Sequence, residues 1–286
     1  MSGRRRVLVF IHINKTAGTT LRYILRSSYG TRHCDVEPWH GPWTDPPFST
    51  SDLLRVRRLY PRLASIAGHR ISGHIDLEEA RTDLRYVTVL REPIALCASR
   101  FQYRLDHRKR SDLSFEEWIQ KDWARNAQTQ RIGGTPDAND AIAVIGRKNM
   151  FVGLTEAFDE SMILLQALRA PDLDIRYAPV NVAKSSNIAK DLLADERTRG
   201  MLAEANRADL ELYEHVKREV FPAQLQEYGP SLPESVGALR EGGRKGFGFN
   251  RRNLAMYGIK QRWLLKPAMQ LYRRRATRGV VEALVG

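Results

Sequence analysis

Residues 7–21 read VLVFIHINKTAGTTL, and this stretch decides how the N-terminal half of the chain folds. Val7–Ile13 is an apolar, β-branched run, which is typical of a buried strand in a parallel sheet. A turn rich in Thr and Gly follows, and Thr20–Ser28 then has apolar residues at helical spacing. A strand, a short turn and a helix in this order form the opening of a nucleotide-binding unit.

The turn carries the residue types that hold a phosphate or sulfate group. Backbone N–H groups at a helix start attract anions, Gly18 lets the backbone approach one closely, and Lys15 adds a mobile positive charge. In the P-loop pattern GxxxxGK[ST] the lysine follows the second glycine, whereas here Lys15 precedes Gly18 and the turn has no earlier glycine. This order argues against a nucleotide triphosphatase.

A second apolar run, Tyr86–Leu90, ends at Arg91-Glu92-Pro93. Because proline is tolerated in the first turn of a helix, we expect a helix over residues 94–105. Further helices are predicted over residues 52–67, 160–169 and 205–220, and a strand over 150–154. Strands that alternate with helices predict an α/β fold, namely a P-loop-like, mainly parallel sheet with helices on both faces, plus a basic C-terminal appendage.

The decapeptide HINKTAGTTL at residues 12–21 resembles the 5′-phosphosulfate loop of carbohydrate sulfotransferases that use 3′-phosphoadenosine 5′-phosphosulfate (PAPS), whose usual form is close to HIPKTGGTSL. The pattern looks most like the uronyl and heparan sulfate 2-O-sulfotransferase group and its bacterial homologues. Residues 86–93, followed by Ser99, resemble the family's 3′-phosphate motif, a strand that ends in LR(D/E)P and leads to a helical Ser. Residues 126–133, 151–159 and 206–221 resemble later parts of the family pattern.

This resemblance implies an enzyme, a PAPS-dependent O-sulfotransferase that moves a sulfuryl group to a hydroxyl of a carbohydrate or glycolipid. PAPS is then the co-substrate, and no metal is expected. A doubly charged phosphate suits the forked donors of an arginine. The residues expected to bind PAPS are Asn14, Lys15, Thr16, Ala17, Gly18, Thr19, Thr20, Arg91 and Ser99.

Sulfuryl transfer needs a base for the acceptor hydroxyl and a positive charge at the leaving phosphate oxygen. We predict that His74 is the base, because the family that this sequence resembles carries a Gly-His pair between its two phosphate motifs. We predict that Lys15 supplies the positive charge. His69 shares the Gly-His dipeptide and is the competing base. The carboxylates of Glu78 and Glu79 are a third choice.

The chain has 286 residues and a net charge of +13. From residue 240 onward there are twelve basic and two acidic residues, so most of the excess charge lies in the tail. Two alternatives from other classes stay open. A P-loop small-molecule kinase would bind ATP with Mg²⁺, and a basic nucleic-acid-binding protein would need its charge on the folded domain. The charge distribution disfavours the second, and we expect no nucleic-acid partner.

Cys34 and Cys97 are too few for a disulfide framework, and no Cys/His cluster indicates a metal. The apolar run before Lys15 is short and has no small-residue cleavage site, so we do not expect a signal peptide. No stretch reaches the roughly 18–20 apolar residues of a membrane span. We therefore expect a cytoplasmic protein that is at most peripheral on a membrane.

Residues 1–228 are predicted to form the sulfotransferase domain, and residues 229–286 a linker and a basic, amphipathic tail. Gly229–Gly248 is rich in Gly, Pro and Ser, as linkers are. The tail's alternation of basic and apolar residues fits an anionic membrane surface, although Pro267 makes a continuous helix doubtful. Candidates for stacking on sugar rings are Trp39, Trp43 and Trp123.

Overall fold

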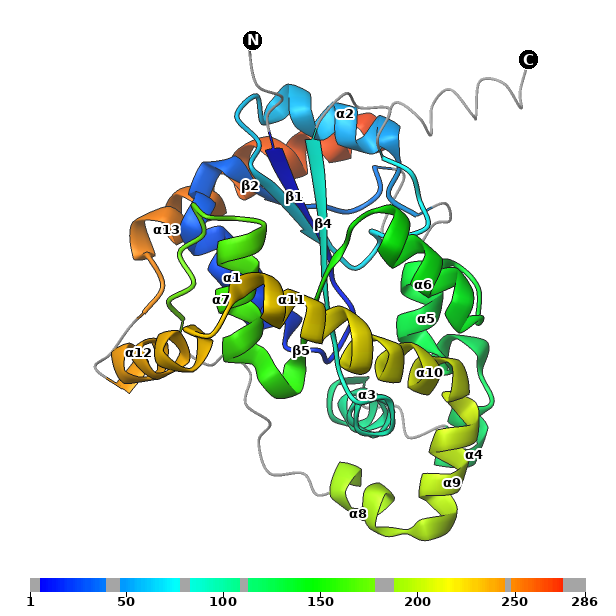
Figure 1. The fold of residues 1–286 in the computed structure, drawn as a ribbon. Helices are drawn as coiled ribbons and strands as arrows, with labels where there is room; N and C mark the ends of the chain where they lie inside the picture. Colours follow the sequence, from blue (N-terminus) through cyan, green and yellow to red (C-terminus); the bar gives the residue numbers. More distant parts are fainter. Residues whose placement is uncertain are drawn as a thin grey trace, which may run out of the picture.

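The computed structural model describes residues 6–39, 47–77, 83–108, 113–177, 188–244 and 248–274. Within these ranges the centre of the molecule is a five-stranded sheet in the order β2-β3-β1-β4-β5, and every neighbouring pair is parallel. Helices surround the sheet, so the expected α/β fold is confirmed (Figure 1). The strands are β1 (Arg6–Ile11), β2 (His33–Asp35), β3 (Ser65–Gly68), β4 (Asp83–Leu90) and β5 (Phe151–Leu154).

The predicted first strand occupies the middle of the sheet. Residues 7–11 of β1 are buried, as expected for a strand covered on both faces. Ile11 lies beside Gly68 of β3 and Thr88 of β4, so the carboxyl ends of the three strands meet at one edge. The segments that leave this edge carry His12, His69 and Arg91. In open parallel sheets this edge is where ligands bind.

The helices are arranged around this edge and behind it (Figure 1). The first, α1, follows β1 directly, and α3 follows β4. In the figure α10 and α11 cross the sheet, with α5 and α6 beside α10. The helices are α1 (Gly18–Tyr29), α2 (Thr50–Leu59), α3 (Pro93–Arg108), α4 (Phe115–Ile119), α5 (Ala127–Gly133), α6 (Ala138–Arg147), α7 (Phe158–Leu168), α8 (Ile188–Ala194), α9 (Glu196–Ala205), α10 (Arg207–His215), α11 (Phe221–Tyr228), α12 (Leu232–Arg244) and α13 (Arg251–Lys260), with 3₁₀ turns η1 (Gly30–Arg32), η3 (Asp122–Ala124) and η4 (Thr155–Ala157).

Two short strands were not predicted. The helix expected over residues 52–67 ends at Leu59, two residues before Pro61, and residues 65–68 form β3 instead. β2 lies in a segment for which no strand was predicted. Both strands have only three or four residues. Only long-range pairing, of β3 with β1 and of β2 with β3, distinguishes such short runs from loops.

The C-terminal segment differs from the expected linker. Residues 232–244 form α12, which contacts α7, and Arg240 of α12 pairs with Asp159 at 2.6 Å. The helix that begins with α13 continues to Arg274 through a wider π-helical turn, Gln261–Leu265. This turn relieves the clash that Pro267 would otherwise make with the carbonyl four residues earlier. Pro267 therefore does not break the helix, while the division of the chain at Tyr228 stays a prediction.

No helix within the described residues combines the length and the apolar character needed to cross a membrane.

Candidate functional site

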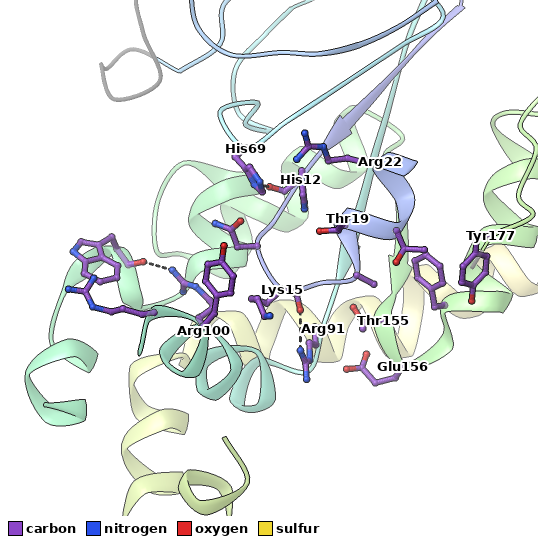
Figure 2. Close-up of a pocket in the computed structure, with 18 of the residues that line it drawn as sticks. His12, Lys15, Thr19, Arg22, His69, Arg91, Arg100, Thr155, Glu156 and Tyr177 are labelled. Atoms are coloured by element: carbon purple, nitrogen blue, oxygen red, sulfur yellow. Dashed lines mark hydrogen bonds between the residues drawn. The ribbon is translucent and has the colours of Figure 1, made fainter. Parts of the chain in front are cut away.

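A cavity of about 1000 Å³ opens at the carboxyl edge of the sheet (Figure 2). Residues that directly follow four of the strands contribute to its wall: His12 after β1, His69 after β3, Arg91 after β4 and Thr155 after β5. The turn that connects β1 to α1 forms the centre of the wall. The other lining residues are Asn14, Lys15, Ala17, Gly18, Thr19, Thr20, Arg22, Arg100, Tyr103, Arg104, Trp118, Trp123, Glu156, Phe158 and Tyr177.

The turn after β1 has an unusual backbone. Lys15 (φ 71°) and Ala17 (φ 58°) both adopt the left-handed conformation, which non-glycine residues rarely occupy. Alternation of left-handed and ordinary residues curves the backbone so that successive N–H groups converge, as in anion-binding nests. The positive end of α1 begins at Gly18, directly after this turn. The local fold therefore has the backbone geometry of an anion-binding turn, and anion binding by these residues stays a prediction.

Gly18 is required here for a reason that the sequence did not reveal. A Cβ atom at this position would lie 2.1 Å from Cδ2 of His12, whose ring occupies the space beside the glycine. His12 is itself buried and stacks on His69, with ring centroids 3.9 Å apart. Any side chain at position 18 would thus displace the floor of the cavity.

Two of the predicted binding residues are not on the cavity wall. Thr16 is buried, and its hydroxyl donates to the carbonyl of Ile13 at 3.0 Å, which ties the turn to itself. Ser99 is half-buried on α3 and is not among the lining residues. Their direct roles toward a ligand stay predictions.

Lys15 and Arg91, the two predicted cationic residues, meet at the cavity. A guanidinium N–H of Arg91 donates to the carbonyl oxygen of Lys15 at 3.2 Å, as Figure 2 shows. Burial and the neighbouring charge of Arg91 lower the pKa of the Lys15 ammonium. The ammonium also lies 5.0 Å from the centre of the Tyr103 ring. Because the positive charges of Lys15 and Arg91 lie close together, an anion bound between them would be stabilised.

Arg91 is held in place by a buried glutamine. Gln128 of α5 is fully buried, and its side-chain amide bonds both the N–H (3.0 Å) and the carbonyl (2.9 Å) of Arg91. Asp209 of α10 in turn accepts from the N–H groups of Gln128 and Thr129 at the start of α5. The segment 126–133, matched to the family by its sequence, therefore positions Arg91.

Sequence reasoning missed Arg22, which lines the cavity from α1. Its Nε donates to Asp35 at 3.0 Å. Burial acts to raise the pKa of Asp35, but the hydrogen bond from His33 and the charges of Arg22 and Arg26 hold it well below its usual range. Arg22 follows Gly18 by one helical turn, so it shares the cavity-facing side of α1, and this spacing could have identified it.

A basic stripe on α3 was also missed. Arg100, Tyr103 and Arg104, at helical spacing, all line the cavity. Arg100 is fixed by hydrogen bonds to the carbonyls of Trp123 (2.8 Å) and Ala124 (2.9 Å). Burial lowers its pKa, and the guanidinium nevertheless stays charged.

The two competing histidines occupy different places. His69 lines the cavity, and its Nδ1 lies 3.1 Å from the carbonyl of His12, which can only accept a hydrogen bond. Burial and the charge of Arg22 lower the pKa of His69 to about 4. His74 is not among the lining residues, and its ring packs against Gly134.

The surroundings of His74 are basic. Its Nδ1 is buried without a hydrogen-bond partner, and burial and the charge of Arg131 lower its pKa. Arg131 is 3.4 Å from the hydroxyl of Ser72. Burial and the charges of Arg70 and Arg100 lower the pKa of Arg131 to about 10. His74 thus lies beside a group of arginines, namely Arg70, Arg100 and Arg131, of which Arg100 lines the cavity.

Some predicted residues lie elsewhere. Glu78, Glu79 and Trp43 fall outside the described residues. Trp39 is buried against Tyr272, away from the lining set, whereas Trp123 is 51% exposed and lines the cavity. Within the described segments, no cluster of His, Cys, Asp and Glu could hold a metal ion.

Comparison with known proteins finds carbohydrate sulfotransferases. The chain is 28% identical over 244 residues to mouse (Mus musculus) galactose-3-O-sulfotransferase 3, covering 73% of this chain and 54% of that protein. It is 27% identical over 297 residues to the human (Homo sapiens) protein of the same name, covering 92% and 66%. Human galactosylceramide sulfotransferase is 27% identical over 269 residues, covering 82% and 62%. The resemblance to carbohydrate sulfotransferases is thereby confirmed.

The chain spans about half the length of the first relatives it matches. Their names specify galactose or galactosylceramide, whereas the sequence pattern pointed to the uronyl group. No family model matches the chain. A solved sulfotransferase from Alicyclobacillus acidocaldarius aligns with 71% of this chain and 96% of its own, at 14% identity and a TM-score of 0.38.

Proposed function

We propose that this protein is a PAPS-dependent O-sulfotransferase that transfers a sulfuryl group to a hydroxyl of a carbohydrate or glycolipid. One observation carries the proposal: the two sequence motifs for phosphate binding meet at a single cavity, where Arg91 contacts the carbonyl of Lys15. The names of the matched relatives support the same reaction class.

PAPS suits the residues of this cavity. Its volume of about 1000 Å³ is at the upper end of the range for cofactor sites. The acid among the wall residues, Glu156, accepts hydrogen bonds from the N–H of Glu92 and the hydroxyl of Tyr213, so its oxygens are already engaged. When bound, PAPS supplies an activated sulfuryl group attached to a phosphate leaving group. The cationic residues on the wall are Lys15, Arg22, Arg91, Arg100 and Arg104.

The chain's own residues then bind, orient and neutralise. The turn after β1 and the start of α1 hold the phosphosulfate end, and Lys15 places its ammonium at the leaving oxygen. The Arg91 fork binds a phosphate, with Gln128 fixing its backbone. His74 takes the proton of the acceptor hydroxyl. Catalysis therefore rests on alignment and on preorganised positive charge.

For the acceptor we propose a galactosyl residue of a glycan or glycolipid. The relatives' names favour galactose. Tyr103 and Trp123 line the cavity and are 48% and 51% exposed, so their rings can stack on a sugar. Transfer rates to galactose- and glucose-terminated oligosaccharides test this, and equal rates would remove the galactose preference. That the protein works in the cytoplasm stays a prediction.

Thermal unfolding with nucleotides tests the proposed reaction class. The desulfated product, 3′-phosphoadenosine 5′-phosphate (PAP), should stabilise the folded state by mass action, by about 2.7 kcal/mol at a hundredfold excess over Kd. For a chain of this size the rise in Tm is then about 5–10 °C. ADP and ATP should stabilise less, because they lack the 3′-phosphate. Greater stabilisation by ATP with Mg²⁺ would favour the kinase alternative and overturn the proposal.

Gln128→Ala should weaken nucleotide binding indirectly, because residue 128 supports Arg91 and does not itself contact the nucleotide. The change removes the hydrogen-bond partners of the partly buried N–H and carbonyl of Arg91, at about 1 kcal/mol or more each. We expect a lower Tm and at least tenfold weaker PAP binding by calorimetry. Gln120→Ala, at an exposed position after α4, is the matched control and should change neither quantity. Unchanged PAP affinity in Gln128→Ala would show that Arg91 does not need this support.

A further inference from the structure

The C-terminal helix, residues 251–274, exposes more large apolar side chains than any other part of the described structure. Eight such residues are exposed in the described ranges. Tyr103 and Trp123 line the cavity, and Leu54 lies on α2. The other five are on the C-terminal helix: Met256 (44%), Ile259 (53%), Trp263 (73%), Leu264 (38%) and Leu271 (53%).

Packing within the chain does not explain this surface, because the helix has a separate inner face. Leu265 and Met269 are buried in the main core. Asn253 donates to the carbonyl of Ser27 at 2.6 Å, and Tyr257 donates to Asp35. Lys260, Gln261 and Arg273 donate to backbone carbonyls of residues 31, 35, 38 and 39. Figure 1 shows α13 beside α1, and these contacts hold the helix against α1 and the segment that follows it.

The outer face combines the apolar residues with positive charge. Met256, Ile259 and Trp263 are at helical spacing, so they lie on one side. Residues 251–274 contain seven Lys and Arg and no Asp or Glu. Five of these basic residues are exposed: Arg251, Arg252, Arg262, Lys266 and Arg274. A rigid helix therefore presents an apolar stripe with basic residues and without an acid of its own.

We propose that residues 251–274 bind an anionic lipid surface, with Ile259 and Trp263 entering the headgroup boundary and the exposed basic residues contacting acidic headgroups. Helices of this composition lie in the membrane interface, where tryptophan is a preferred anchor. A polyanion such as a sulfated glycan would match the charge but leave the apolar stripe in water. A second copy of the helix would cover the stripe but bring like charges together. A lipid surface satisfies both features, and the proposal is independent of sulfuryl transfer.

Vesicle flotation of the full-length protein tests the proposal. The protein should float with phosphatidylcholine vesicles that contain phosphatidylserine, much less with phosphatidylcholine alone, and less at high salt. Arg262→Glu with Lys266→Glu should lower the partition coefficient by at least about 30-fold, since each basic residue near the surface contributes about 1 kcal/mol. Ile259→Ser with Trp263→Ser should also abolish flotation. Arg197→Glu with Arg199→Glu, at exposed positions of α9, is the matched charge control and should float as the unmodified protein does.

The outcomes separate the possible occupants. Thermal unfolding should be unchanged in all variants because the substituted side chains are exposed, so lost flotation reports binding and not misfolding. Failure of the unmodified protein to float with anionic vesicles overturns the proposal. Equal flotation of the Ile259→Ser, Trp263→Ser variant also overturns it. Retention on a heparin column without flotation, or a dimer by light scattering that these serines dissolve, would assign the surface to a polyanion or to a second copy.

Discussion

Replacing Lys15 by methionine is expected to lower kcat for sulfuryl transfer from PAPS by roughly 10²–10³-fold, the usual loss when a preorganised group that stabilises developing charge is removed. Lys15 lies in the left-handed turn beside Arg91 at the cavity wall. Lys15 is the residue of this turn whose side chain carries a positive charge. The loss should appear mainly in kcat, because charge on the leaving oxygen grows as the bond breaks.

The fold should survive this change. The pKa of Lys15 is lowered, which means that the folded protein disfavours the charged ammonium relative to the unfolded chain. Methionine removes the charge and keeps the length of the side chain, so Tm should be unchanged or slightly higher. Lys217→Met, at an exposed position, is the control for removing a positive charge elsewhere. Near-normal kcat in Lys15→Met would remove Lys15 from the reaction.

The central part of the fold could be predicted because its signals are local. β1, the anion-binding turn and α1 follow one another within about 24 residues, and their residue types indicate each element directly. A local signal also starts α4, where Ser114 and Glu117 form a capping box. The positions of Lys15 and Arg91 at the edge of the sheet could be predicted for the same reason, because each residue follows a recognisable strand.

What could not be predicted depends on contacts between distant residues. β3 is a strand only because it pairs with β1, and β2 only because it pairs with β3. Arg22 reaches the cavity wall with support from Asp35, and Arg100 is fixed by the carbonyls of Trp123 and Ala124. The support of Arg91 by Gln128 joins residues 37 positions apart. Helical spacing could have indicated which sides of α1 and α3 carry Arg22 and Arg100, but the contacts that support these arginines leave no periodic signal in the chain.

His74→Ala is expected to lower kcat by about 10²–10⁴-fold, the range for loss of a general base. A base must be neutral and must also accept a proton readily near neutral pH. The pKa of His69, about 4, makes its imidazole a weak proton acceptor, and its ring is held between His12 and the cavity. His74 is only half-buried, and the positive charge of Arg131 lowers its pKa. An anion bound nearby would offset that charge and raise the pKa of His74.

The pH profile distinguishes the two histidines. Burial and the charge of Arg131 lower the pKa of His74 from its ordinary value of 6.5, so at pH 7 the ring is neutral in the free protein. As the pH falls through this lowered pKa the base is protonated, and kcat/KM should fall, with a midpoint below 6.5. If His69 were the base, the midpoint would lie near 4. His74→Ala should remove this acidic limb.

His69→Asn completes the test because asparagine can keep the hydrogen bond to the carbonyl of His12 while lacking a titratable ring. We expect it to raise KM for PAPS, since His69 is part of the cavity floor, and to leave kcat within about tenfold, less than the loss of a general base would cause. The cavity wall as it stands includes His69 and not His74, so an acceptor that binds only against the wall would favour His69. A severe loss of kcat in His69→Asn, with normal kcat in His74→Ala, would therefore transfer the role of base to His69 and place the acceptor hydroxyl deep in the cavity, beside the turn after β1.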